Sequence, residues 1–225
     1  MRLWLAVTLL FLSVAPARPD TVLTCAGGDI TVTAPTADSA QHVCDVARIA
    51  RPQLQACHLP QTAPLRITVT DTLPPQHDRC LGLYDCREDV IGVLDTDALR
   101  QRVPPSSAFA RLPPDILHDS LIVHEMTHAL IFQKLGQDSG GLAANEYMAY
   151  AMQVEFLPEA MRQRFLATRS HTQPVTDDSI NDLILKMAPD FFAIFAWQHF
   201  RQPDHGCALF DRLLTGSDPF QKPEP

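Results

Sequence analysis

The sequence predicts an α+β fold, in which a small N-terminal β-sheet with one helix precedes a mainly helical C-terminal half. Short β-branched segments of alternating polarity occur before residue 95, and apolar residues recur at helical spacing from about residue 114 onward. With 225 residues, 46% of them hydrophobic, the chain can bury one substantial core. We therefore expect a single domain over residues 18–225.

The N-terminal segment, residues 1–17, is typical of a secretory signal peptide. Arg2 gives a positive start, residues 3–14 form an apolar run, and Ala15-Pro16-Ala17 is a small-residue cleavage site. The apolar run is too short to act as a membrane-spanning stop-transfer helix. We expect cleavage after Ala17 and a secreted or periplasmic mature protein.

Three strands and one helix are expected in the N-terminal half. Residues 29–34 (DITVTA), 64–70 (PLRITVT) and 89–94 (DVIGVL) read as strands because they are rich in β-branched residues. Residues 37–56 carry Ala, Val and Ile at helical spacing, which predicts a helix after the first strand.

The C-terminal half begins with a loop over residues 103–114, rich in Pro and Ser, that leads into a long central helix. Pro113 and Pro114 suit the first turn of this helix, and Gly136 ends it. A second helix is predicted over residues 142–157. Further helices are expected at about 159–169, 178–187, 190–201 and 204–214.

The chain contains six cysteines, all of which follow the signal peptide. An even number of cysteines in an oxidising compartment predicts three disulfides rather than thiolate metal sites. Cys80 and Cys86 enclose a short loop and are expected to pair.

The other four cysteines are constrained by the helix at 37–56. It holds Cys44 and Cys57 roughly 20 Å apart, too far for a bridge, so they must pair with Cys25 and Cys207. If the helix returns beside the first strand, Cys25 lies near the far helix end. This arrangement favours Cys25 with Cys57, and Cys44 with Cys207.

The charge balance restricts the partners. With 18 basic and 26 acidic side chains, the net charge of −8 argues against nucleic acid. It also disfavours an anionic membrane surface after signal removal. The sequence does not indicate the oligomeric state.

The central helix carries His124-Glu125-Met126-Thr127-His128 in an otherwise almost wholly apolar stretch. Histidines four residues apart lie on one helix face, so their imidazoles can converge on a single tetrahedral zinc ion. The acid between them can act on water at the metal. This HExxH pattern predicts a Zn²⁺ site with His124 and His128 as ligands and Glu125 as the catalytic base.

A catalytic zinc needs a third protein ligand. Ile131 and Lys134 stand where the metzincin pattern requires Gly and His, so that class is excluded. The good candidate is Glu146 on the next predicted helix, and Asp138 in the intervening loop is the alternative. Glu155 follows Glu146 by nine residues, and nine steps of 100° place it on the opposite helix face.

At this point the sequence resembles the gluzincins, the thermolysin-like clan of zinc metallopeptidases, from about residue 115 to 155. Their third ligand is a Glu on the helix after HExxH, often with Asn before it and a small residue three positions later. Asn145, Glu146 and Ala149 match that pattern. The resemblance implies a zincin-like fold, bound zinc and peptide-bond hydrolysis. The family carries an Asp four residues after the Glu, and Tyr150 stands there instead, so ligand orientation must come from elsewhere.

The sequence does not assign the residue that would stabilise an oxyanion in such a site. The donors that could stabilise an oxyanion are Tyr147, Tyr150, His171, His199 and His205. His118 lies on a different helix face from His124 and is expected not to be a ligand. In zincins the strand before the motif helix usually borders the cleft, so we expect residues 89–94 to pair with an extended substrate.

The sequence therefore predicts an exported zinc-dependent metallopeptidase whose partner is a peptide or protein substrate. Zinc would lower the pKa of bound water, and Glu125 would accept its proton and deliver it to the leaving amine. The alternative is a catalytically inactive zincin-like module that binds metal or a protein partner. A third interpretation is a disulfide-stabilised structural protein with a chance motif.

Overall fold

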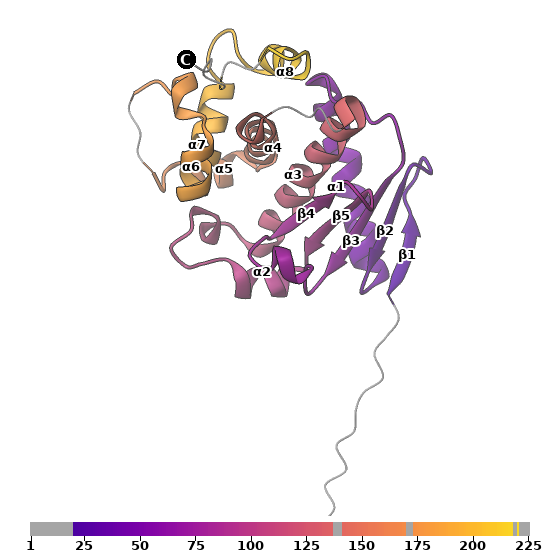
Figure 1. Cartoon of the computed structure of the whole chain (residues 1–225). Helices are drawn as coiled ribbons and strands as arrows, with labels where there is room; N and C mark the ends of the chain where they lie inside the picture. Colours follow the sequence, from indigo (N-terminus) through magenta and orange to yellow (C-terminus); the bar gives the residue numbers. More distant parts are fainter. Residues whose placement is uncertain (1–19, 137–140, 170–172, 218–219, 221–225) are drawn as a thin grey trace, which may run out of the picture.

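The computed structural model describes residues 20–136, 141–169, 173–217 and 220. The predicted signal peptide at residues 1–17 lies outside these ranges. Within them, a mixed five-stranded sheet and eight α-helices form the α+β fold that the sequence predicts. Figure 1 shows the sheet on one side of the molecule, helices α4 to α7 on the other, and α3 between them.

The sheet has the strand order β1-β2-β3-β5-β4. Its strands are β1 (Thr21–Thr24), β2 (Ile30–Ala34), β3 (Leu65–Thr70), β4 (Gly82–Asp85) and β5 (Val90–Leu94). The three strands predicted from the sequence are the central parallel strands β2, β3 and β5. The edge strands β1 and β4 pair antiparallel and were not predicted. Each has only four residues, and β4 falls in the segment expected to be the cysteine loop.

Two long helices pack against the sheet and against each other. Helix α1 (Ala37–Ala56) has the predicted bounds and contacts β1 and β2, whereas α3 (Pro114–Leu135) contacts β4 and β5. Thr36 caps α1 by accepting a hydrogen bond from the Ser39 amide. Gly136, with a φ of 63°, ends α3, as expected for a residue in the left-handed region.

The C-terminal half is mainly helical. Helix α4 (Leu142–Phe156) packs between α3 and α7. The other helices are α2 (Thr96–Arg102), α5 (Glu159–Leu166), α6 (Asp182–Met187), α7 (Pro189–Phe200) and α8 (Cys207–Leu214). Helix α2 was not predicted, and α5, α6 and α8 are shorter than the predicted segments.

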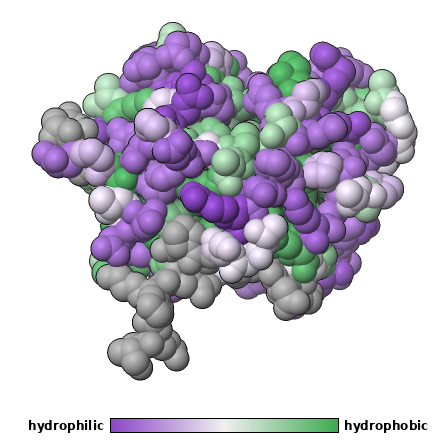
Figure 2. All heavy atoms as spheres, turned by 90° about the horizontal axis from the view of Figure 1, so that it is seen from above, coloured by the Kyte–Doolittle hydropathy of each residue, from purple (hydrophilic) through white to green (hydrophobic). Residues whose placement is uncertain are grey.

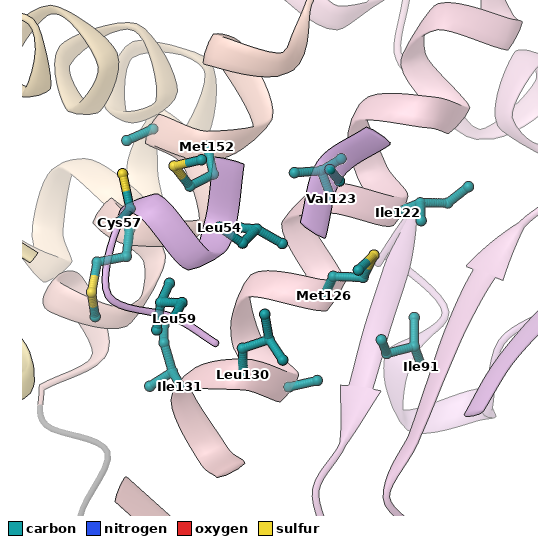
Figure 3. Packing of buried hydrophobic residues seen from close by; sticks show 14 of the residues in the cluster. Leu54, Cys57, Leu59, Ile91, Ile122, Val123, Met126, Leu130, Ile131 and Met152 are labelled. Carbon is teal, nitrogen blue, oxygen red and sulfur yellow. The ribbon is translucent and has the colours of Figure 1, made fainter. Parts of the chain in front are cut away.

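The main core lies between α1, α3 and the sheet. Figure 3 shows Leu59, just after α1, beside Ile131 of α3, and Met126 of α3 on the side of Ile91 in β5. All four side chains are buried. Burial of a large aliphatic side chain stabilises the fold by about 1.5–3 kcal/mol. These contacts fix the rotation of α3 and therefore the direction of its polar face.

The disulfide prediction was wrong for all three pairs. The structure contains Cys25–Cys44 and Cys57–Cys207, with Cα separations of 5.4 and 4.4 Å, and leaves Cys80 and Cys86 as free thiols.

The physical reasons lie in the lengths of the elements. A five-residue strand spans about 16 Å and a 20-residue helix about 30 Å, so Cys25 before β2 lies level with Cys44 rather than with the end of α1. Cys57 at that end meets the first residue of α8 instead. The segment between the other two cysteines forms strand β4, which places them at opposite ends of a strand and not across a loop.

The two disulfides indicate an oxidising environment such as the extracellular space. No helix within the described ranges is both long and apolar enough to pass through a bilayer. The face seen in Figure 2 is largely hydrophilic, with hydrophobic residues in small patches among polar ones.

Candidate metal centre

The two motif histidines and Glu146 converge on one point between α3 and α4. The Nε2 atoms of His124 and His128 are 3.1 Å apart. The carboxylate of Glu146 lies 3.5 Å from His124 Nε2 and 3.6 Å from His128 Nε2. The structure thus brings together the three residues that the sequence assigns to a metal. Asp138, the alternative ligand, lies outside the described residues.

These separations fit the donor set of a tetrahedral zinc ion. Zn–N bonds of about 2.0–2.1 Å and Zn–O bonds of about 2.0–2.2 Å at tetrahedral angles place the ligand atoms about 3.3–3.5 Å apart. The observed values of 3.1, 3.5 and 3.6 Å scatter around that range. Two imidazoles and one carboxylate leave the fourth position for water or substrate, as catalytic zinc sites do.

The pKa values of the three side chains reflect their burial and mutual charge. Burial lowers the pKa of His128 to about 4. Burial would also lower the pKa of His124, but the hydrogen bond with Glu146 and the nearby carboxylates raise it overall. For Glu146, burial acts to raise the pKa, but the two histidines outweigh it and lower the pKa to about 2. At neutral pH an anionic carboxylate therefore faces the two imidazoles.

Glu125 lies beside this group and beneath strand β4. Its side chain is almost fully buried, and burial raises its pKa to about 7, while His124 and the backbone amide of Tyr84 act in the opposite direction. A Cβ atom on Gly82 would lie 2.6 Å from Oε1 of Glu125. Only a glycine therefore lets the strand approach this carboxylate. A pKa near neutrality suits a group that must both accept and release a proton.

Gln153 is the buried polar neighbour of His124 on the side away from the other ligands. Nδ1 of His124 and Oε1 of Gln153 are both buried without a well-formed hydrogen bond, and the Gln153 amide is among the groups that favour protonated His124. The Gln153 amide nitrogen donates to Ser120 Oγ at 3.3 Å. An Nδ1–H donor on His124 and the Oε1 acceptor of Gln153 are complementary, so Gln153 can orient the histidine. No motif or spacing in the sequence indicated this residue.

Tyr150 is the candidate oxyanion donor that the structure places in the cleft. Its ring packs edge-on against the ring of His124, with centroids 4.6 Å apart. Burial, followed by the charges of Glu146 and Glu125, strongly raises the pKa of its hydroxyl, which therefore stays protonated. The hydroxyl makes no hydrogen bond with the described part of the chain.

The other donor candidates do not line the cleft or lie outside the described ranges. His199 is hydrogen-bonded to Tyr147 at 3.2 Å and to Asp177 at 3.0 Å, and His205 is bonded to the backbone of His199. His171 falls outside the described ranges.

His118 and Glu155 lie away from the three candidate ligands, as the sequence predicted. His118 does not join the metal centre and lies instead with His42 and Asp119, whose side chains are hydrogen-bonded to each other at 2.6 Å. Glu155 points away from the centre and accepts a hydrogen bond from the Trp197 indole at 2.7 Å.

The centre opens into a cleft of about 1230 Å³. Its lining includes strand β4 with the residues before it, the loop after α2, the start of α7 and Arg169. Glu125, His124 and His128 also line it. The cleft is large enough for several residues of a peptide.

The expectation that residues 89–94 pair with substrate was wrong. Strand β5 is an inner strand whose two edges are occupied by β3 and β4. The strand with a free edge beside the cleft is β4.

A family model described as a family of unknown function, DUF6639, matches residues 30–223 of the chain. No curated protein and no solved structure matches it. The matched range includes the sheet from β2 onward, the metal centre and helix α8.

Proposed function

Because the chain belongs to the DUF6639 family, whose description gives no function, we propose one from the site itself: an exported, zincin-like zinc metallopeptidase of the gluzincin type. The observation that carries the proposal is the convergence of His124, His128 and Glu146 to within 3.6 Å of one another, next to a buried glutamate. Together they match the ligand set and the base of HExxH peptidases.

In this proposal, the residues of the site act as metal ligands, as general base and as oxyanion donor. His124, His128 and Glu146 would hold Zn²⁺, which supplies Lewis acidity toward water and the scissile carbonyl. Glu125, whose pKa is about 7, would accept a proton from the attacking water and deliver it to the leaving amine. The protonated hydroxyl of Tyr150 would donate to the oxygen that becomes negative in the transition state.

Peptide binding would use the free edge of β4. An extended peptide can add to an exposed strand through main-chain hydrogen bonds. Strand β4 is the sheet edge above Glu125, so a peptide paired with it would pass over the base. The two disulfides agree with export, and a secreted or periplasmic location is part of the proposal.

The test combines metal analysis with peptide cleavage in wild type, His124→Ala and Glu125→Gln. We expect one zinc per chain in wild type and in Glu125→Gln, and a large loss of zinc in His124→Ala. Wild type should cleave members of an internally quenched peptide library, and Glu125→Gln should lose 10²–10⁴-fold in kcat/KM, the contribution of general-base catalysis.

Three outcomes would contradict different parts of the proposal: no bound zinc, zinc without cleavage, and cleavage that does not depend on Glu125. If purified protein holds no stoichiometric zinc and His124→Ala changes nothing, both the peptidase and the metal-binding module are excluded. Zinc binding without cleavage of any library member would support the inactive zincin-like module instead. Equal cleavage by wild type and Glu125→Gln would show that the base is assigned wrongly.

A further inference from the structure

Arg169 places a positive charge in the wall of the cleft. It lies in the turn after α5 and lines the same cavity as His124 and Glu125. Its guanidinium packs on the ring of Phe191, with Cζ 5.1 Å from the centroid, and Phe191 also lines the cavity. The proposed peptidase site therefore contains a cation held on an aromatic platform.

The guanidinium of Arg169 has no hydrogen-bonding or acidic partner within the described ranges. Its side chain is partly buried, and its Nε is buried without a hydrogen bond. No ion pair or side-chain hydrogen bond joins it to the residues that the structure describes. A buried donor without a partner destabilises the protein, so a ligand that accepts a hydrogen bond from it is favoured.

The acid closest along the chain to Phe191 is already engaged. Asp190 accepts hydrogen bonds from the Ser107 hydroxyl at 3.0 Å and from the Ala108 amide at 2.6 Å. Its carboxylate thus ties α7 to the loop after α2. The guanidinium of Arg169 is therefore available to bind an anionic group of a ligand that enters the cleft.

The other arginines near this region have partners for their terminal guanidinium nitrogens, although Nε of Arg162 is buried without a hydrogen bond, as Nε of Arg169 is. Arg162, on α5, also packs on an aromatic ring, that of Trp197, but it donates to two backbone carbonyls and pairs with Glu159. Arg102, in the cleft wall, donates to the Asp78 carbonyl. Arg79 lines the cleft but is exposed, so water can satisfy it.

We infer that Arg169 is a specificity residue that binds a carboxylate of the substrate. A guanidinium presents a planar fork of donors that matches a carboxylate in two parallel hydrogen bonds, and stacking on Phe191 pre-orients that fork. The carboxylate can be the C-terminus of a peptide or the side chain of Asp or Glu. This inference rests on the proposed peptidase function and adds the substrate class: peptides that carry a negative charge at one subsite.

The binding test uses the zinc-loaded Glu125→Gln protein, which should hold peptide without turning it over. Matched peptides are taken from the cleaved library members: free C-terminus against C-terminal amide, and internal Asp or Glu against Asn or Gln. We expect the preferred carboxylate peptide to bind about 10- to 100-fold more tightly than its neutral match, the range of a charged hydrogen bond. The arm that shows the difference identifies the source of the carboxylate.

Second variants assign the preference to one residue. Adding Arg169→Gln should abolish the difference between charged and neutral peptides, and Arg169→Lys should keep part of it because the charge remains without the fork. Arg162→Gln is the matched control, because it removes an arginine on a ring outside the cleft, and should keep the full preference. Thermal unfolding of each variant checks that it is folded.

The outcomes separate this inference from the function on which it rests. If wild type cleaves peptides but charged and neutral matches bind equally, or if the preference survives Arg169→Gln, the carboxylate subsite is wrong and the peptidase stands. If wild type cleaves nothing and no peptide binds, the proposed function fails, and the subsite fails with it.

Discussion

At the scale of single residues, the candidate metal centre differs from the thermolysin-like pattern in the residues around His124. The thermolysin-like pattern places an Asp four residues after the Glu ligand, and Tyr150 occupies that position here. Gln153, seven residues after Glu146 on the same helix α4 and 1% exposed, lies next to His124. We propose that this neutral amide orients His124 in place of the missing carboxylate.

Replacing Gln153 should therefore weaken metal binding more than it weakens the fold. We expect Gln153→Met, which keeps the volume and removes the acceptor, to lower zinc affinity by 10–100-fold, the usual effect of losing an orienting partner. Competition with a chromophoric chelator measures it. Gln153→Glu keeps an acceptor and should recover most of the affinity. An unchanged affinity in Gln153→Met would mean that His124 is oriented by packing alone.

Residue identity at the site was predictable where it follows from helical periodicity. His124, Glu125 and His128 lie on one helix, so local spacing was sufficient to predict that His124 and His128 share a face. Glu146, on the next helix, was preferred over Asp138 because the sequence resembles the gluzincin pattern. The candidate hydroxyl donor was not predictable, because five tyrosines and histidines were candidates in the sequence and only tertiary packing puts Tyr150 against His124. The orienting role of Gln153 depends on the same packing of α4 on α3.

At the scale of elements, strand β4 determines how the cleft is built. Its segment contains Gly and Asp and lies between two cysteines, composition that indicates a loop when read locally. Pairing with β5 makes it a strand, with Tyr84 opposite Ile91. Such a short edge strand is specified by its neighbours rather than by its own propensity, which is why the sequence pointed to β5 as the cleft strand.

Gly82→Ala should separate catalysis from metal binding. The new Cβ would lie 2.6 Å from Glu125 Oε1, so the carboxylate must move from its position beside the metal centre. We expect a fall of 10²–10⁴-fold in kcat/KM, equal to the loss of the base, with zinc content unchanged.

The matched control for this substitution is Gly92→Ala in β5. There the nearest atom is Cδ2 of Leu73 at 3.2 Å, the movable end of a side chain, and no site residue is involved. Its kcat/KM should stay close to wild type. Equal losses in Gly82→Ala and Gly92→Ala would indicate general damage to the sheet instead of displacement of Glu125.

At the scale of the whole molecule, the two halves of the fold were predictable and their covalent connection was not. The parallel strands β2, β3 and β5 and the long helices α1, α3 and α4 carry strong periodic patterns, so their order followed from the sequence. Disulfide pairing depends on which element ends meet in space. The position of α8 against the end of α1 is such a long-range fact, with 150 residues between Cys57 and Cys207.

This long-range bridge should contribute more to stability than the local one. In the chain-entropy account, closing a loop of 150 residues stabilises the folded state by about 5 kcal/mol, against about 3 kcal/mol for the 19-residue loop of Cys25–Cys44. We expect the double variant Cys57→Ser, Cys207→Ser to lose more unfolding free energy in urea titrations than Cys25→Ser, Cys44→Ser. The reverse order would show that α8 docks on α1 without help from the bridge, and that the sheet edge around β1 depends on Cys25–Cys44 for its attachment.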